Sequence, residues 1–273
     1  MPITLRLTRE PVVPLEAEVL CPDTLAELSN AEIRALTVYH GKRQLPLGEF
    51  FDVEGERSGD MVLHGDLRKV RWIGRAMSQG SITIHGKAGM HLGAYMRGGL
   101  IEVHGDASDW VGAEMSGGVI RVHGNAGGQI GAAYRGALRG MRNGTIIIDG
   151  SAGLEVGMRM RRGTIVLGGP AKDFTGLQMK GGTIVLLSGA EIRTGAWMNR
   201  GTILSLKPLH LMPTFAHAAD YNPGFVTLLA RHLRQFGVQL PYAETDGRYQ
   251  LYSGDLSVPG KGEILVWQPA AIG

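Results

Sequence analysis

Short apolar segments recur along most of this chain at a fixed interval. Each one follows a glycine and is rich in β-branched side chains, and its second and fourth positions are apolar, as in Gly80-Ser-Ile-Thr-Ile-His-Gly86. Such alternation with period two places the apolar side chains on one face of a strand. The opening glycines, spaced 19, 19, 26, 19, 19 and 19 residues apart, are Gly80, Gly99, Gly118, Gly144, Gly163, Gly182 and Gly201, with a looser copy at Gly59. The pattern predicts one short strand per repeat.

Further columns recur at fixed distances from the opening glycine. An alanine follows at eight residues and a second glycine at thirteen. Sixteen residues after the opening glycine stand Met96, Met115, Tyr134, Met160, Met179 and Met198. This count takes the 26-residue step as one repeat that carries seven extra residues. A unit this short cannot bury its own apolar face, so successive units must stack, with equivalent residues about 4.8 Å apart.

Stacked 19-residue units predict a mainly β protein. We expect residues 58–207 to form a parallel β-helix of seven or eight coils, right-handed like most parallel crossovers. Leucine-rich, hexapeptide and helical repeats fit the period less well, because their lengths or residue patterns differ.

Both ends depart from the repeat. Residues 1–57 predict a small α/β cap with a strand at 3–7, a helix that begins after Ser29 in a capping box with Glu32, and a strand leading into a turn at 38–42. Residues 208–273 predict a tail with a helix capped by Asn222, then strands at 249–252 and 263–267.

The outward position three residues after the opening glycine changes character along the chain. It is polar in the early repeats and apolar in the later ones, in the order Thr83, Glu102, Arg121, Ile147, Val166, Val185 and Leu204. An apolar outer face needs a cover. The helix of the tail is the nearest candidate, and a partner protein is the alternative.

Composition narrows the class of protein. The chain has 273 residues, 44% hydrophobic and 19% charged, which argues against wholesale disorder. No apolar run is long enough for a membrane helix and no secretory leader is recognisable, so we expect a cytoplasmic protein. With 28 basic and 25 acidic residues, nothing suggests bulk binding to nucleic acid. A single cysteine excludes an internal disulfide.

A polar column occupies the fifth position after the opening glycine: His64, His85, His104, His123 and Asp149. Histidine is the commonest metal ligand, and a contact with a partner is a second alternative. Side chains in one column of a β-helix lie parallel, however, which suits stacking better than convergence on an ion. Two imidazolium charges about 4.8 Å apart would repel by roughly 3–4 kcal/mol at an effective dielectric of 20. We therefore expect a structural ladder of mostly neutral histidines.

The sequence offers little for catalysis. It lacks a nucleophile elbow, a phosphate-binding loop and acids paired across repeats, and Cys21 is of the type more often found as a small buried hydrophobe. We expect this chain to bind no cofactor or metal of its own.

Cations gather at one corner of the repeat. Arg97, Arg135, Arg161 and Lys180 stand seventeen residues after the opening glycine, Arg162 and Arg200 stand one residue further on, and the insertion adds Arg139 and Arg142. Stacking would align them as a stripe that binds a long anionic ligand or an acidic partner. The alternative is that they are solvated charges at turns.

The repeats at 98–117 and 117–131 resemble a GxGxG β-helix that two families share. One family is the C-terminal domain of the large chain of glutamate synthase, and the other is the C subunit of formylmethanofuran dehydrogenase. Segments 47–53, 253–255 and 260–264 look like this C subunit, and nearly the whole chain takes part. Within that family the chain looks closest to the C subunit of the formyltransferase/hydrolase complex of methylotrophic bacteria.

This resemblance implies a non-catalytic scaffold in a hetero-oligomer. The implied partners are an amidohydrolase-type A subunit that holds zinc, a companion B subunit and a formyltransferase D subunit. Such complexes transfer a formyl group from formyl-tetrahydromethanopterin to a furan-type carrier, methylofuran, and release formate. The polyglutamate tail of the carrier would suit the cation stripe. The alternatives are the C subunit of a methanogen enzyme that reduces CO2 to formylmethanofuran, a glutamate-synthase-like domain, and an independent enzyme or sugar-binding β-helix.

Overall fold

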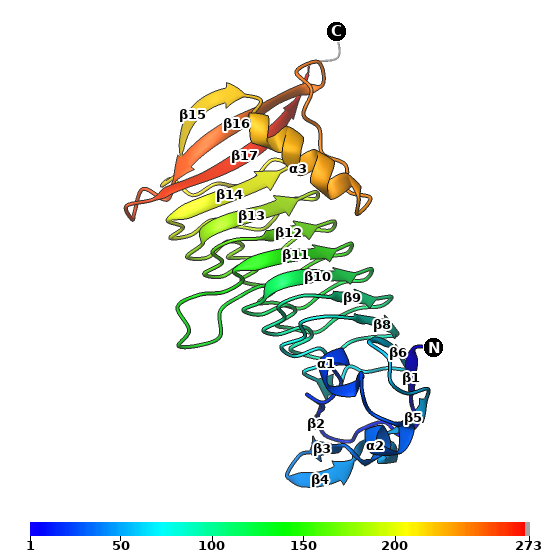
Figure 1. Ribbon diagram of the computed structural model, residues 1–273. Coiled ribbons are helices and arrows are strands. Elements are labelled where there is room, and N and C mark those ends of the chain that lie inside the picture. The colour runs from blue at the N-terminus through cyan, green and yellow to red at the C-terminus, as the bar shows by residue number, and fades with distance from the viewer. Residues whose placement is uncertain (271–273) are drawn as a thin grey trace.

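The computed structural model describes residues 1–270 and shows a long, mainly β molecule (Figure 1). Thirteen strands form one mixed sheet in the order β15-β16-β17-β14-β13-β12-β11-β10-β9-β8-β6-β1-β5. In chain order these strands are β1 (Ile3–Leu7), β5 (Phe51–Glu54), β6 (Asp60–His64), β8 (Ser81–His85), β9 (Leu100–Val103), β10 (Ser116–Val122), β11 (Asn143–Ile148), β12 (Thr164–Leu167), β13 (Lys180–Leu186), β14 (Arg200–Ser205), β15 (Ala216–Tyr221), β16 (Gly247–Gly254) and β17 (Lys261–Pro269).

Residues one repeat apart are neighbours in space. Strands β6 and β8 to β14 pair in parallel, and Ile82, Ile101 and Ile120 occupy equivalent positions in three successive strands. A second parallel ladder of single bridges joins Leu67, Ala88, Ala107, Ala126, Ala152, Ala171 and Ala190. The stacking predicted from the 19-residue period is confirmed, and the architecture is β-helix-like. The handedness, the number of coils and the boundaries at 57/58 and 207/208 stay predictions.

Apolar columns fill the interior between the two ladders. The methionine column is fully buried, as are the paired isoleucines and valines of each strand. Glycine is required where the chain turns beside this interior. Gly93 has φ +60°, and a Cβ atom there would lie 2.5 Å from Cδ1 of Ile120, which belongs to the repeat that opens at Gly118. A larger residue would therefore clash with the core as well as strain the backbone.

The region before β6 contributes strand β1 to the main sheet. Strand β1 pairs in parallel with β6 and antiparallel with β5. The predicted capping box is present, since the backbone N–H of Ser29 donates to Glu32 Oε2 at 2.8 Å. The remaining elements of this region are β2 (Leu15–Glu16), α1 (Pro22–Leu25), α2 (Asn30–Ala35), β3 (Thr37–His40), β4 (Arg43–Pro46) and η1 (Leu47–Glu49), and β2 to β4 form a small second sheet with β7 (Val70–Arg71).

The tail continues the main sheet and covers its outer face. Strand β17 pairs in parallel with β14 and so adds another rung, after which β16 and β15 follow antiparallel. The sequence did not predict β15. Helix α3 (Gly224–Arg234) begins one residue later than expected, with Pro223 as its N-cap, and the Asn222 side chain donates instead to the Gly247 carbonyl at 2.9 Å.

Helix α3 covers the apolar outward residues of the later coils. Ile147, Val166, Val185 and Leu204 form a second buried cluster together with residues of the tail, Val226, Ala230 and Leu233 of α3 among them. The predicted cover is confirmed, and this face of the later coils does not need a partner to be buried. Among the described residues, no helix is long and apolar enough to cross a bilayer.

Candidate functional site: a histidine ladder and a basic corner

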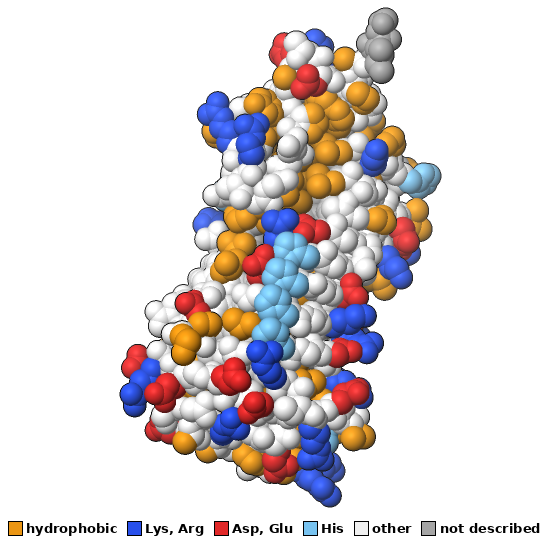
Figure 2. All heavy atoms as spheres, turned by 90° about the vertical axis from the view of Figure 1, so that its right-hand side faces the viewer, with side chains coloured by type: hydrophobic (Ala, Val, Ile, Leu, Met, Phe, Trp, Pro, Cys, Tyr) orange, Lys and Arg blue, Asp and Glu red, His pale blue; other side chains and the backbone are white. Residues whose placement is uncertain are grey.

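The predicted histidine column is an unbroken stack on the surface (Figure 2). The four residues end or follow strands β6, β8, β9 and β10, and the parallel register aligns them. Ring centroids lie 4.9 Å apart between His64 and His85, 4.8 Å between His85 and His104, and 5.0 Å between His104 and His123. The interplanar angles are 20°, 5° and 12°, so the rings lie face to face. Asp149 continues the column, as the sequence predicts.

The two ends of the ladder differ in their electrostatics. At the first end, partial burial and then the charges of Arg6 and His85 lower the pKa of His64, which favours its neutral form. At the other end, both ring nitrogens of His123 lie 2.8 Å from carboxylate oxygens, Nε2 from Glu102 and Nδ1 from Asp149. The hydrogen bond from His123 lowers the pKa of Glu102.

Arg121 connects the ladder to the tail. Its guanidinium contacts both oxygens of Asp149 at 3.2–3.3 Å and donates to the carbonyl of Phe236 at 2.9 Å. Sequence reasoning identified Arg121 only as a polar outward residue. Its partner on the tail lies 115 residues away, and no local pattern indicates such a contact.

The ladder geometry favours stacking over metal chelation. Parallel rings aim their nitrogens side by side rather than toward one point. Within residues 1–270 no group of three or more His, Cys, Asp or Glu side chains is arranged to hold a metal ion. Cys21 is buried, and desolvation raises the pKa of its thiol to about 11, which leaves it a poor nucleophile.

The basic corner needs one correction. Met141, fully buried, takes the interior position that the sequence assigned to Tyr134, and its backbone N–H bonds to Gly131 across the insertion. Arg142 therefore stands in the stacked column where Arg135 was predicted, and Arg135 lies in the insertion loop. The period alone allows either alignment, and the interior selects methionine because only an apolar side chain fits there. The observed column is Arg97, Ser116, Arg142, Arg161, Lys180 and Asn199, each bonded through its backbone N–H to a methionine carbonyl one coil earlier.

The insertion loop, residues 134–140, is held at both sides. The ring of Tyr134 stacks on Trp110 at 4.7 Å, and its hydroxyl lies 2.8 Å from Nδ1 of His91. On the other side, Nη1 of Arg159 donates to the Ala137 carbonyl at 2.7 Å. His91 and Trp110 both stand eleven residues after an opening glycine, and this aromatic column was missed although the repeat contains it.

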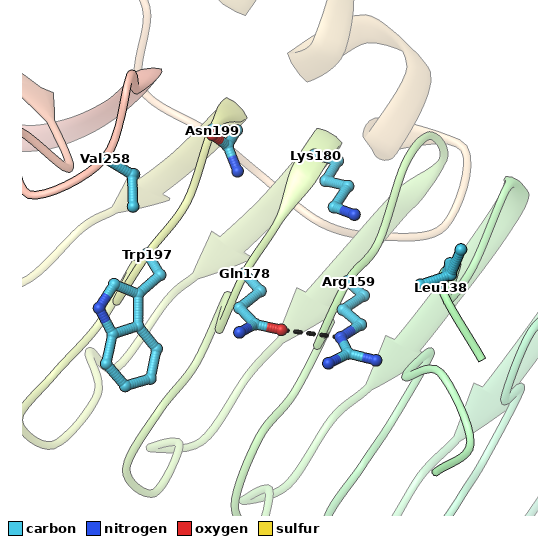
Figure 3. A pocket seen from close by; sticks show the side chains of 7 residues that line it. All are labelled: Leu138, Arg159, Gln178, Lys180, Trp197, Asn199 and Val258. Atoms are coloured by element: carbon cyan, nitrogen blue, oxygen red, sulfur yellow. Dashed lines mark hydrogen bonds between the residues drawn. The ribbon is translucent and has the colours of Figure 1, made fainter. Parts of the chain in front are cut away.

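A shallow groove lies between the insertion loop and the last coil (Figure 3). Arg159 Nε donates to Gln178 Oε1 at 2.7 Å on its floor, and the Trp197 indole lies at one end. Its volume is about 470 Å³, and it is lined by Leu138, Arg159, Gln178, Lys180, Trp197, Asn199 and Val258. These described residues include no aspartate or glutamate.

The predicted cations have no acidic partner within the described part of the chain. Neither Arg97 nor any cation of the corner forms an ion pair with a carboxylate of residues 1–270. Nη2 of Arg97 donates to the Ala76 carbonyl at 3.3 Å. The set comprises Arg97, Arg135, Arg139, Arg142, Arg161, Arg162, Lys180 and Arg200, all exposed except the half-buried Lys180.

Comparison with known proteins identifies the repeat. A family model described as the GXGXG motif matches residues 57–215. The C subunit of the molybdenum-containing formylmethanofuran dehydrogenase 1 of Methanothermobacter thermautotrophicus is 44% identical over 83 residues, which are 30% of this chain and 21% of that protein. The C subunit of the tungsten-containing formylmethanofuran dehydrogenase 2 of the same organism is 36% identical over 97 residues, which are 34% of this chain and 36% of that protein. The matched segments thus span between a fifth and just over a third of these relatives.

One solved structure matches along almost the entire length. It is the crystal structure of the formyltransferase/hydrolase complex (FhcABCD) from Methylorubrum extorquens in complex with methylofuran. One of its chains is 35% identical, with a TM-score of 0.88, and the match covers 98% of this chain and 99% of that one.

Proposed function

Because this chain belongs to the GXGXG motif family and, within it, to the family of formylmethanofuran dehydrogenase C subunits, we propose that it is the C subunit of a formyltransferase/hydrolase complex. One observation carries this proposal: the end-to-end match to a chain of such a complex, at a TM-score of 0.88. The homologues are subunits of enzyme complexes, so a hetero-oligomer follows.

In this proposal the chain is a scaffold and the chemistry belongs to its partners. The A subunit, of the amidohydrolase type, holds zinc, the B subunit accompanies it, and the D subunit transfers the formyl group from formyl-tetrahydromethanopterin to methylofuran. Hydrolysis then releases formate, in the cytoplasm. Support comes from the buried, protonated Cys21 and the stacked imidazoles, neither of which suits nucleophilic or metal chemistry.

The cations of the corner would bind the polyglutamate tail of the carrier or an acidic partner surface. Arg142, Arg161 and Lys180 follow one another on adjacent coils and have no carboxylate partner among the described residues. Cations spaced by about 4.8 Å along a rigid edge match a chain of carboxylates.

Reconstitution tests the scaffold role. The chain, co-expressed with the A, B and D subunits, should join a stable complex, and by itself it should neither hydrolyse formylated carrier nor bind polysaccharide. Formyl hydrolysis by the isolated chain would contradict the proposal. Co-purification with an amidotransferase would indicate a glutamate-synthase-like domain instead.

Substitution tests the carrier role. Replacing Arg135, Arg139 and Arg142 by alanine should weaken the affinity of the assembled complex for methylofuran, and more strongly at low salt. An unchanged affinity at low salt would contradict a carrier role for these cations and leave the scaffold role in place.

The methanogen enzyme is the second candidate, favoured by the 44% identity over 83 residues to the C subunit of a molybdenum-containing enzyme. A host complex that contains molybdenum or tungsten would support it. A complex of only four kinds of chain, without either metal, would support the first candidate.

A further inference from the structure

We propose that the groove between the insertion loop and the last coil binds an acidic segment of another subunit, one that also carries an apolar side chain. The inference rests on the proposed function, because it requires a hetero-oligomeric complex. It goes further by naming one docking site on this chain and the chemistry of its occupant.

The groove is formed by rigid elements. One wall is the insertion loop, which Tyr134 anchors to Trp110 and His91, and which Arg159 anchors through the Ala137 carbonyl. The other wall carries Trp197, whose backbone N–H donates to Asp255 Oδ2 at 2.9 Å. A partner that binds here orders little of the loop, so little conformational entropy opposes binding.

The charges of the groove select an anion. Lys180 and Arg159 contribute two cations, and neither forms an ion pair within residues 1–270. Arg159 uses Nε and Nη1 on protein oxygens, and no described residue accepts a hydrogen bond from Nη2. Together with the amides of Gln178 and Asn199, these groups offer donors without a competing carboxylate among the described lining residues.

Exposed apolar side chains at both walls select a protein segment over a bare anion. Leu138 at the loop is 69% exposed, and Trp197 at the opposite wall is 49% exposed. Tryptophan is among the side chains that contribute most at protein interfaces when a partner covers them. A free carboxylate would leave both side chains in water, whereas a peptide with an adjacent apolar residue would cover them.

The dimensions favour an extended segment. The groove crosses the coils that carry Arg159, Gln178 and Trp197, which stack one after another at about 4.8 Å per coil. The backbone N–H groups of Lys180 and Asn199 are already bonded to Met160 and Met179 at 2.8 Å. The occupant therefore binds through side chains and does not add a strand to the sheet.

Assembly measurements test the site. The affinity of this chain for the purified remaining subunits would be measured for Lys180→Glu and Trp197→Ala. Controls at the far end are Lys42→Glu in the turn after β3 and Tyr39→Ala, since both residues are exposed there. We expect each groove variant to lower the affinity for the other subunits by roughly 10-fold or more, as replacement of a central interface residue typically does. The controls should stay within about twofold.

Thermal unfolding and circular dichroism of the isolated variants check that they fold. If a groove variant is destabilised, p-benzoylphenylalanine at Leu138 in the assembled complex serves as a second measurement. A crosslink from that position to an Asp/Glu-containing segment of another subunit would support the site.

Normal assembly by both groove variants, with no crosslink from position 138, would overturn the inference. So would variants that weaken methylofuran binding but not assembly, since that result would assign the groove to a small anionic ligand. A wild-type chain that does not assemble with these subunits would instead overturn the proposed function itself.

Discussion

Residues at equivalent positions of the repeat differ in their electrostatics because the side chains around them differ. His64 and His123 occupy the same column, but partial burial and then the charge of Arg6 lower the pKa of His64, while carboxylate oxygens lie beside both ring nitrogens of His123. The sequence predicts the alignment of these side chains, because alignment follows from the period. It does not predict their electrostatics, because Arg6 and Phe236 come from the two non-repetitive ends.

Stability should decrease as pH falls through the range in which histidines titrate. Burial lowers the pKa of both His64 and His91 in the folded chain, and the charges of Arg6 and Arg71 lower them further. The unfolded chain, with histidine pKa values near 6.5, therefore binds more protons in this range. Their contribution to stability is complete above about pH 6.5 and is lost below it, so the melting temperature should fall between about pH 7.5 and pH 5.5.

The double variant His64→Gln/His91→Gln is the matched comparison for that experiment. It should show a shallower dependence of the melting temperature on pH than the wild type. An equally steep dependence would mean that other groups titrate. Glu102 does not confound the result, because its lowered pKa confines its effect to more acidic pH.

Cys21 should be almost inert toward alkylation in the folded protein. The side chain is 4% exposed, and desolvation raises its pKa to about 11, so only about one thiol in a thousand is ionised at pH 8. Labelling by iodoacetamide should be roughly 100-fold or more slower in buffer than in guanidinium chloride. As the chain has one cysteine, mass spectrometry reads the rate directly. Comparable rates in the two solvents would mean that the cap opens readily.

At the scale of single elements, interior packing determines how the insertion is aligned within the repeat, which the period does not. The 26-residue step fits an insertion either before or after the methionine position: counting forward from Gly118 places Tyr134 there, and counting back from Gly144 places Met141 there. The interior excludes the first alignment, because Met141 is fully buried in the column while Tyr134 stacks outside on Trp110. The cover of the later coils was predictable for the opposite reason: four apolar outward residues in a row require one, and α3 is the only long amphipathic segment in the described part of the tail.

Met141→Ala should destabilise the protein by about 2–5 kcal/mol, because it removes a buried side chain from a column that cannot collapse around the gap. Leu138→Ala, three residues earlier and 69% exposed, is the matched control and should change stability by less than about 0.5 kcal/mol. Chemical denaturation measures both. If the control were the more harmful of the two, the assignment of the column would be wrong.

Across the whole molecule, each coil contacts mainly the coil before and the coil after it. Such a chain tolerates changes that preserve the period and not those that break it, because a one-residue shift turns inward side chains outward. The surroundings of the basic corner also depend on the whole molecule, because distant parts of the chain meet there. The sequence predicted cations along one edge, but the groove beside them is formed by an insertion, the last coil and a tail residue, Val258, whose proximity no repeat pattern encodes.

Removing one whole coil should therefore leave a folded protein. Deletion of residues 86–104 takes out 19 residues and joins His85 to Gly105, so the remaining columns stay aligned. Deletion of 86–103, one residue fewer, is the control and should misfold. Circular dichroism and size-exclusion chromatography distinguish the outcomes, and equal folding of both variants would contradict a fixed interior register.

The strands at the two ends of the main sheet pair antiparallel, unlike those in its middle. Its long parallel middle is closed at one end by the antiparallel pair β1 and β5, and at the other by β16 and the largely exposed β15. A bare parallel rung would accept an identical rung from a second molecule, and nothing in the repeat itself would stop such addition. The non-repetitive ends replace such a bare rung with antiparallel strands, and we expect a truncation that exposes β14 to promote end-to-end association.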